Sequence, residues 1–209
     1  MIKIAIEKKI GGRYGTLELK VNTAFNLNTV TRILGPSGIG KTTLLKILAG
    51  LILPDIGTVT FENDIWFDQR IAYSKKAQDR NIGFVFQDYA LFPNMTVEKH
   101  LRFGTDDDAY IAHLLEIGEM TNLKNRFPKQ LSGGQQQRLA ILRALSTKPK
   151  VLLMDEPFAA LDTQLKSRLI MGLKQLFFEQ QTTVILVTHQ GNELGDDNSY
   201  VFELKGAED

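Results

Sequence analysis

The sequence predicts an α/β fold in which helices cover a parallel β-sheet. Two apolar runs, Val151–Met154 and Val184–Val187, have the composition of strands that are buried on both faces. A stretch with helical spacing over 161–178 separates them. This strand–helix–strand order indicates a parallel sheet whose chemistry lies at the carboxyl ends of its strands. A glycine-rich loop at 35–42, between an apolar run and a helical pattern, places a phosphate site at such an end.

The composition describes one well-buried domain of 209 residues. The 25 Lys and Arg residues nearly balance the 24 Asp and Glu residues, so we expect no nucleic-acid partner. The absence of cysteine excludes disulfides and thiol catalysis. Because no apolar run approaches the ~20 residues of a membrane span and charges fill the N-terminal stretch, we expect a cytoplasmic chain. Any membrane role then requires a partner.

The N-terminal part predicts an antiparallel sheet. Residues 2–6 alternate apolar and polar, and residues 17–21 repeat this pattern, as half-buried strands do. A turn at 54–57 is followed by a predicted strand at 58–61. The polar residues 62–81 are expected to be a surface excursion, in which Trp66 packs partially and does not stack on a ligand.

Residues 35–42 read Gly-Pro-Ser-Gly-Ile-Gly-Lys-Thr and fit the phosphate-loop pattern. Glycine reaches positive φ cheaply, so backbone N–H groups can turn toward phosphate oxygens. Lys41 is expected to bridge the β- and γ-phosphates, and Thr42 to ligate Mg²⁺. The alternative, a glycine-rich turn before an ordinary helix, would match by accident in ~1 % of chains this long. The expected ATP-binding residues are Gly35, Pro36, Ser37, Gly38, Ile39, Gly40, Lys41, Thr42 and Thr43.

Two further motifs point to the same chemistry. The buried strand at 151–154 ends in Asp155 and Glu156, which we expect to orient Mg²⁺ and to polarise the attacking water, respectively. The run Leu131–Gln135, Leu-Ser-Gly-Gly-Gln, opens a helix and predicts a second anion site. The alternative is a helix capped by Ser132, which leaves the two glycines unexplained, because each weakens a helix by ~1 kcal/mol.

The stretch from Pro93 to about Leu145 loses the strand pattern and predicts an inserted helical subdomain. We divide the chain into a core at about 1–87 and 146–209 and a helical subdomain at about 88–145. The acidic run 106–108 is expected to cap a helix and not to bind a metal. His100 and His113 are expected to lie on the surface.

In this order, residues 35–42, 131–135 and 151–156 resemble the Walker A, signature and Walker B motifs of ATP-binding cassette (ABC) ATPases, over nearly the whole chain. The resemblance implies a P-loop NTPase (RecA-like) core. It also implies that Gln87 is the Q-loop glutamine that senses Mg²⁺, and that His189 is the switch histidine at the γ-phosphate. Asp162 matches the D-loop, in which Ala159 stands where many relatives have serine. Tyr14 is the candidate to stack on adenine, with a turn aromatic as the alternative.

In this family two nucleotide-binding domains pack head to tail around ATP and Mg²⁺. The resemblance therefore implies a homodimer or heterodimer in which Ser132, Gly133, Gly134 and Gln135 act in trans. The catalytic set in each site would be Lys41, Gln87, Glu156 and His189, and the Mg²⁺ set would be Thr42, Gln87 and Asp155. The partners it implies are integral membrane permease subunits on the cytoplasmic face of the membrane and, indirectly, a periplasmic or extracellular substrate-binding protein.

Residues 81–97 resemble the Q-loop region of bacterial importer subunits, and most closely those of molybdate and related oxyanion importers. This region contacts the permease and not the cargo, so it indicates the branch of the family more strongly than the substrate. Two alternatives stay open. One is an ABC ATPase that powers export, and the other is an ATP-driven clamp with no transport role.

Overall fold

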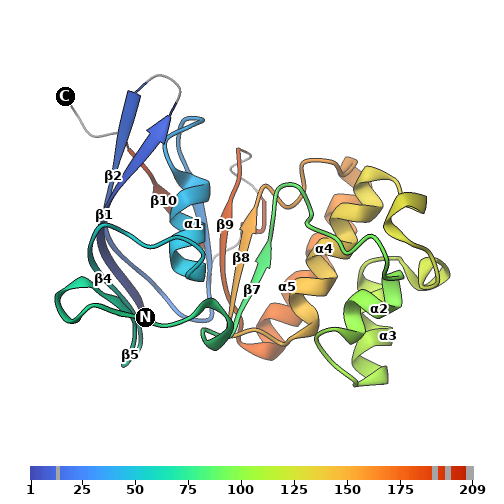
Figure 1. The fold of residues 1–209 in the computed structure, drawn as a ribbon. Coiled ribbons are helices and arrows are strands. Elements are labelled where there is room, and N and C mark those ends of the chain that lie inside the picture. The colour runs from blue at the N-terminus through green and yellow to red at the C-terminus, as the bar shows by residue number, and fades with distance from the viewer. Residues whose placement is uncertain (13–14, 190–192, 196–198, 206–209) are drawn as a thin grey trace.

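The computed structural model of the protein describes residues 1–12, 15–189, 193–195 and 199–205. In these residues an antiparallel sheet and a parallel sheet lie on either side of helix α1, and a group of helices covers the far face of the parallel sheet (Figure 1). This arrangement confirms the α/β class and the N-terminal antiparallel sheet. The strand orders are β2-β1-β4-β5-β6 and β10-β3-β9-β8-β7.

The antiparallel sheet begins with a long hairpin in which Ile4 lies opposite Thr23. Ile2, Ile4 and Ile6 are buried, and the residues between them are exposed, as the alternation predicted. The strands of this sheet are β1 (Ile2–Gly12), β2 (Gly15–Phe25), β4 (Ile56–Phe61), β5 (Asp64–Asp68) and β6 (Tyr73–Ser74).

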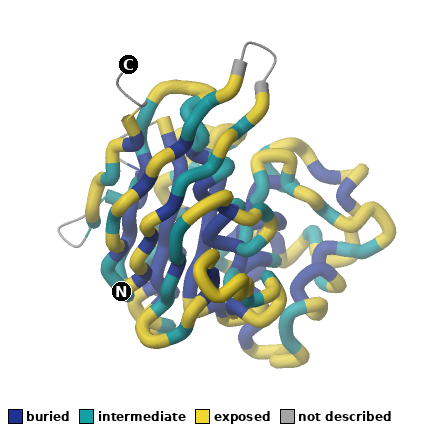
Figure 2. The backbone as a smooth tube through the Cα atoms, turned by 60° about the vertical axis from the view of Figure 1, so that its left-hand side comes forward, coloured by how far each residue is buried: buried dark blue, intermediate teal, exposed yellow. Residues whose placement is uncertain are grey.

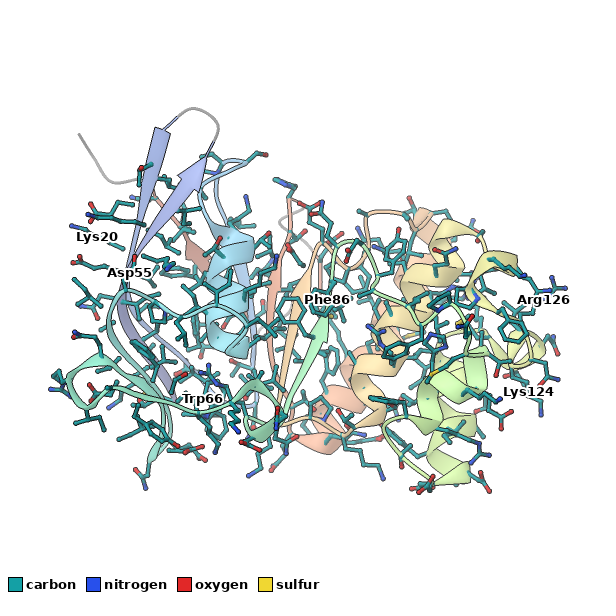
Figure 3. The ribbon with its side chains drawn as sticks, in the orientation of Figure 1. Lys20, Asp55, Trp66, Phe86, Lys124 and Arg126 are labelled. Carbon is teal, nitrogen blue, oxygen red and sulfur yellow. The ribbon has the colours of Figure 1, made fainter. Side chains whose placement is uncertain are left out.

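The stretch 62–81 corrects one prediction in part, because most of its residues are exposed, as a surface excursion would be, but it also adds two strands to the antiparallel sheet. It contains β5, in which Trp66 is only 1 % exposed. The Trp66 ring stacks on Phe61 with centroids 5.2 Å apart, and it lies between the antiparallel sheet and one end of α1 (Figure 3). Trp66 therefore packs as predicted, but its burial is nearly complete and not partial. The strand was missed because charged residues surround a very short apolar segment.

The parallel sheet consists of β3 (Val30–Leu34), β7 (Ile82–Val85), β8 (Val151–Asp155), β9 (Thr183–Val187) and β10 (Ser199–Glu203). All five residues of β8 are buried, which explains its continuous apolar run. Val151 and Leu153 pack toward α1 and the antiparallel sheet, whereas Leu152 and Met154 pack toward α4 and α5. Two hydrophobic cores thus meet at this sheet, whose buried strands run through the middle of the molecule (Figure 2).

Five helices are described: α1 (Lys41–Ala49), α2 (Val97–Arg102), α3 (Asp108–Ile117), α4 (Gly133–Ser146) and α5 (Thr163–Gln180). Four short 3₁₀ turns accompany them: η1 (Gln69–Ile71), η2 (Ala77–Asp79), η3 (Thr121–Leu123) and η4 (Pro128–Gln130). The acidic run at 106–108 does cap a helix, because the Asp107 side chain accepts from the Tyr110 amide at 3.0 Å.

His100 corrects a second prediction. It is completely buried, whereas His113 is exposed as expected. The Phe92 amide donates to Nε2 of His100 at 3.0 Å, and Nδ1 lies 2.8 Å from the Thr96 carbonyl oxygen. Because an amide can only donate, Nδ1 carries the proton and the imidazole is neutral. Burial lowers the pKa of His100 and favours this form.

None of the helices in the described residues is both long enough and apolar enough to cross a membrane.

Candidate functional site

The site lies where four neighbouring parallel strands end. The loop 35–42 follows β3, Gln87 follows β7, Glu156 follows β8, and His189 follows β9. Because these strands are parallel, their carboxyl ends meet at one edge of the sheet. In Figure 3 the labelled Phe86, at the end of β7, shows where this edge lies. A cavity of about 350 Å³ opens at this edge and is lined by Ile10, Ser37, Gly38, Gly40, Lys41, Thr42, Thr43, Gln87, Glu156, Val187 and His189.

The glycines shape the loop at 35–42. Gly35, Gly38 and Gly40 have φ values of 149°, 79° and 103°, which side chains rarely allow. A Cβ on Gly35 would lie 2.6 Å from the Leu204 carbonyl oxygen, so this position also needs the space. Gly40 is the N-cap of α1, and no side chain caps that helix. The N-terminal amides of α1 are therefore suited to an anion.

Lys41 is buried in the fold of the loop. Its Nζ donates to the carbonyl oxygens of Gly35 and Pro36 at 2.7 and 2.8 Å. These bonds bring the ammonium group back over the loop and hold the loop curved. The ammonium group thus lies beside the N-terminus of α1, which no side chain caps. Its positive charge there is suited to a phosphate.

Thr42, from the phosphate loop, and Asp155, from the end of β8, are in contact. Thr42 Oγ1 donates to Asp155 Oδ2 at 2.7 Å, and Asp155 is only 3 % exposed. Burial raises the pKa of Asp155, the nearby Glu156 carboxylate raises it further, and the bond from Thr42 lowers it. A hydroxyl beside a buried carboxylate offers the oxygen ligands that Mg²⁺ prefers. These residues therefore fit a Mg²⁺ site.

Glu156 and His189 form the other polar pair of the cavity. His189 Nε2 lies 3.0 Å from Glu156 Oε1. Glu156 has a φ of 48°, a left-handed conformation that is uncommon for a residue with a side chain, and its amide donates to the Val187 carbonyl oxygen at 3.0 Å. The turn after β8 thus directs the Glu156 carboxylate into the cavity, where it can accept a proton from water.

The residues 132–135 lie elsewhere in the chain. They begin α4, which packs on the opposite face of the parallel sheet from α1 (Figure 1). Ser132 Oγ accepts from the Gln135 amide at 3.3 Å, and Gln135 Oε1 accepts from the Ser132 amide at 2.9 Å, which is a capping box. The capping alternative is therefore right for Ser132.

The two glycines of this motif differ. A Cβ on Gly134 would lie 3.0 Å from the Ala160 carbonyl oxygen, so glycine allows close packing there. A Cβ on Gly133 would meet nothing within 4 Å, and Gly133 is exposed. Nothing in the described part of the chain therefore requires glycine at 133.

One other predicted residue, Asp162, does not line the cavity. Asp162 caps α5, because its side chain accepts from the Leu165 amide at 3.0 Å. Tyr14 lies outside the described residues. Sequence reasoning missed Ile10, although its position in the alternation of β1 placed it on the inner side of that strand. It also missed Gln137, because the sequence does not show which of the three successive glutamines at 135–137 contacts the site.

Comparisons with known proteins agree with this geometry. The sequence model of a family described as "ABC transporter" matches residues 19–159. The chain is 45% identical over 181 residues to the sulfate/thiosulfate import ATP-binding protein CysA of Mesostigma viride, covering 83% of this chain and 50% of that protein. It is 41% identical to the "Probable sulfate/thiosulfate import ATP-binding protein CysA" of Chlorella vulgaris, covering 92% and 83%. The chain spans about half the length of several such curated relatives.

Among solved structures, the chain is similar to the ATP-binding cassette MJ0796 in a dimeric, post-hydrolysis state bound to ADP and Pi. The TM-score is 0.82 at 32% identity, and the match covers 98% of this chain and 94% of the other. A second dimeric structure of MJ0796, described as a bacterial ABC transporter cassette, matches with a TM-score of 0.79.

Proposed function

Because the chain belongs to the ABC transporter family, we propose that it is an ATP-hydrolysing, nucleotide-binding subunit of a transporter. The observation that carries this proposal is the cavity at the carboxyl edge of the parallel sheet. One space there is lined by the phosphate loop, Gln87, Glu156 and His189, with the Thr42–Asp155 pair beside it.

Each residue has a role in this proposal. The loop 35–42 and the amides that begin α1 bind the phosphates, and Lys41 exchanges its loop carbonyls for β- and γ-phosphate oxygens. Thr42 and Asp155, with Gln87, would hold Mg²⁺, which when bound neutralises charge on those oxygens. Glu156 accepts a proton from the water that attacks the γ-phosphorus, and the bond to the leaving ADP oxygen breaks. His189 holds the Glu156 carboxylate and contacts the γ-phosphate.

We propose that two such chains form a head-to-tail dimer in which residues 132–135 complete the partner's site. Two observations support a role in trans: α4 lies across the sheet from the phosphate loop, and Gly133 is exposed without a local reason to be glycine. The similar MJ0796 structures are dimers by their descriptions. Asp162, at the start of α5, would then lie near the same dimer interface.

The proposed partner is an integral membrane permease, which places the subunit at the cytoplasmic face of the membrane. Residues 88–145, which contain α2, α3 and most of α4, would form the helical subdomain that contacts it. The proposed direction is import, with a substrate-binding protein as an indirect partner. The relatives reported above are named for sulfate and thiosulfate, so we propose a tetrahedral oxyanion of that kind as cargo in place of molybdate.

Export and a transport-independent clamp are the competing functions; a purification separates a transporter from the clamp, and a transport assay separates import from export. The tagged chain is isolated from its native cells in mild detergent, and the bound proteins are identified. A polytopic permease supports the transporter, and only soluble partners would support the clamp. With the permease and its binding protein in vesicles, ATP hydrolysis should rise with sulfate or thiosulfate. Stimulation by molybdate alone would restore the molybdate prediction, and outward cargo movement would establish export.

A further inference from the structure

We propose that Gln137 is a positioning residue for Glu156, and that it ties the start of α4 to the turn that carries the proposed base. This inference rests on the proposed function, because it assigns a mechanical role within the same site. Gln137 is the fifth residue of α4 and is only 3 % exposed. Gln137 does not itself line the cavity.

Both ends of the Gln137 amide are used. Nε2 donates to the Glu156 carbonyl oxygen at 3.0 Å, and Oε1 accepts from the Ala160 amide at 2.9 Å. Because the first partner can only accept and the second can only donate, the amide has one possible orientation. A single buried side chain therefore fixes two backbone groups at the two ends of the turn after β8.

The turn needs such support. Glu156 has a φ of 48°, which costs free energy unless neighbouring contacts hold it. The Glu156 amide is held by the Val187 carbonyl oxygen of β9, and the Glu156 carbonyl is held by Gln137 of α4. The backbone that orients the Glu156 carboxylate is thus held by the neighbouring strand β9 at its amide and by helix α4 at its carbonyl.

Gly134 adds a second contact on the same face of α4. Gly134 and Gln137 are three residues apart, so they lie together on the helix surface. Gly134 lets the first turn of α4 pack closely against Ala160 and Leu161, where a Cβ would lie 3.0 and 3.2 Å from their atoms. A movement of this first turn therefore displaces the Glu156–Ala160 segment directly. In the proposed dimer, nucleotide bound by one chain at the other's α4 would then adjust the position of Glu156 in that second chain.

The test compares Gln137→Glu and Gln137→Leu with the wild type. The glutamate variant is nearly isosteric and keeps the acceptor for Ala160, but it places an oxygen opposite the Glu156 carbonyl. The leucine variant loses both bonds. For both variants kcat for ATP should fall about 10- to 100-fold, while KM and ATP affinity stay within about 2-fold, because the phosphate loop is untouched. Gln175→Glu, an exposed change on α5, serves as the matched control with unchanged kcat.

Two further measurements separate positioning from general damage. In single-turnover experiments on a Glu156→Gln background, Gln137→Glu should cause less than about a 2-fold further loss, since the group that it positions is already absent. Amide hydrogen exchange at Ala160 should rise at least about 10-fold in Gln137→Leu, while β8 amides stay protected. The exchange readout needs no ATPase activity. A wild type with no ATPase activity would contradict the proposed function but not the role of Gln137. If amide exchange at Ala160 and kcat stayed unchanged in both variants, the role of Gln137 would be overturned. A variant that does not fold is replaced by the other one.

Discussion

Thr42 and Asp155 are separated by 113 positions in the sequence, and a hydrogen bond of 2.7 Å joins their side chains. The bond connects the first turn of α1 to the last residue of β8. It also places the Asp155 carboxylate, which is buried, beside a hydroxyl oxygen that lines the cavity. This pair therefore links the stability of the site to its proposed use of Mg²⁺.

Asp155→Asn should move stability and activity in opposite directions. The pKa of Asp155 is raised in the folded chain, so folding disfavours its charged form. The free energy of unfolding therefore falls as the pH rises from the unfolded pKa through the folded pKa, where Asp155 becomes charged. Asparagine removes that charge and can still accept from Thr42, so we expect a gain on the order of 1 kcal/mol at neutral pH. Hydrolysis should fall about 100-fold or more because a Mg²⁺ ligand is lost. Thermal unfolding and Mg²⁺ titrations of ATPase activity measure the two effects. A variant that is less stable at neutral pH would contradict the cost assigned to the charge.

Glu156→Gln should separate binding from hydrolysis. Removing the base should lower kcat by about 10²- to 10⁴-fold and leave ATP affinity within about 3-fold, because the phosphate contacts remain. The ATP-bound dimer should accumulate and be visible by size-exclusion chromatography with light scattering. Lys41→Ala is the matched contrast, since it should weaken nucleotide affinity itself. If Glu156→Gln kept wild-type turnover, another residue would have to be the base.

Arg80→Met should destabilise the whole cassette. The Arg80 guanidinium is buried and donates to the carbonyl oxygens of Ile47 and Leu48 at the end of α1, and to that of Trp66 in β5. Burial lowers its pKa to about 10, so it stays charged at neutral pH. Without it these buried acceptors lose their partner, at a cost of about 2–4 kcal/mol.

Urea unfolding measures this cost, and Arg80→Lys should retain part of the stability because one donor group remains. Arg168, whose ion pair with Glu119 is exposed on both sides, offers Arg168→Met as a control that should change stability by less than about 1 kcal/mol. Equal losses in Arg80→Met and Arg168→Met would show that the carbonyl contacts contribute little.

His100 should make stability fall in mild acid. Its pKa is lowered by burial and by the nearby Arg143, although the Thr96 carbonyl opposes this, so the folded chain prefers the neutral form. Because the folded pKa lies below the ordinary 6.5, the stability from neutral His100 is present above 6.5 and is lost as pH falls through the folded pKa. His100→Gln should be about 1–2 kcal/mol less stable than the wild type near pH 7.5, and the gap should shrink near pH 5.5.

Thermal melts at the two pH values test this prediction. His113→Gln, on the exposed surface of α3, is the matched control and should leave the pH dependence unchanged. A gap between wild type and His100→Gln that stays constant with pH would contradict the assignment of a neutral imidazole.

The sequence by itself determined the features that depend on near neighbours in the chain. The glycines of 35–42 predict their own positive φ values, the alternation of β1 predicts which side chains are buried, and the apolar run of β8 predicts a strand covered on both faces. Carboxylates at a strand end and a glycine loop after a strand were enough to place Lys41, Thr42, Asp155 and Glu156 at one edge of a parallel sheet.

Only the tertiary structure decided which distant groups meet. His100 was expected at the surface because the sequence shows no partner for it, yet the Phe92 amide and the Thr96 carbonyl hold it inside. Trp66 and Arg80 lie in a polar stretch of the sequence, and the burial of these two side chains depends on their packing near α1. The sequence does not predict the hydrogen bonds of Gln137 to the turn after β8. Three successive glutamines look alike in the sequence, and only the packing of α4 determines which of them points inward. Local pattern fixes periodicity and backbone preference, whereas long-range packing selects the partner of each buried polar group.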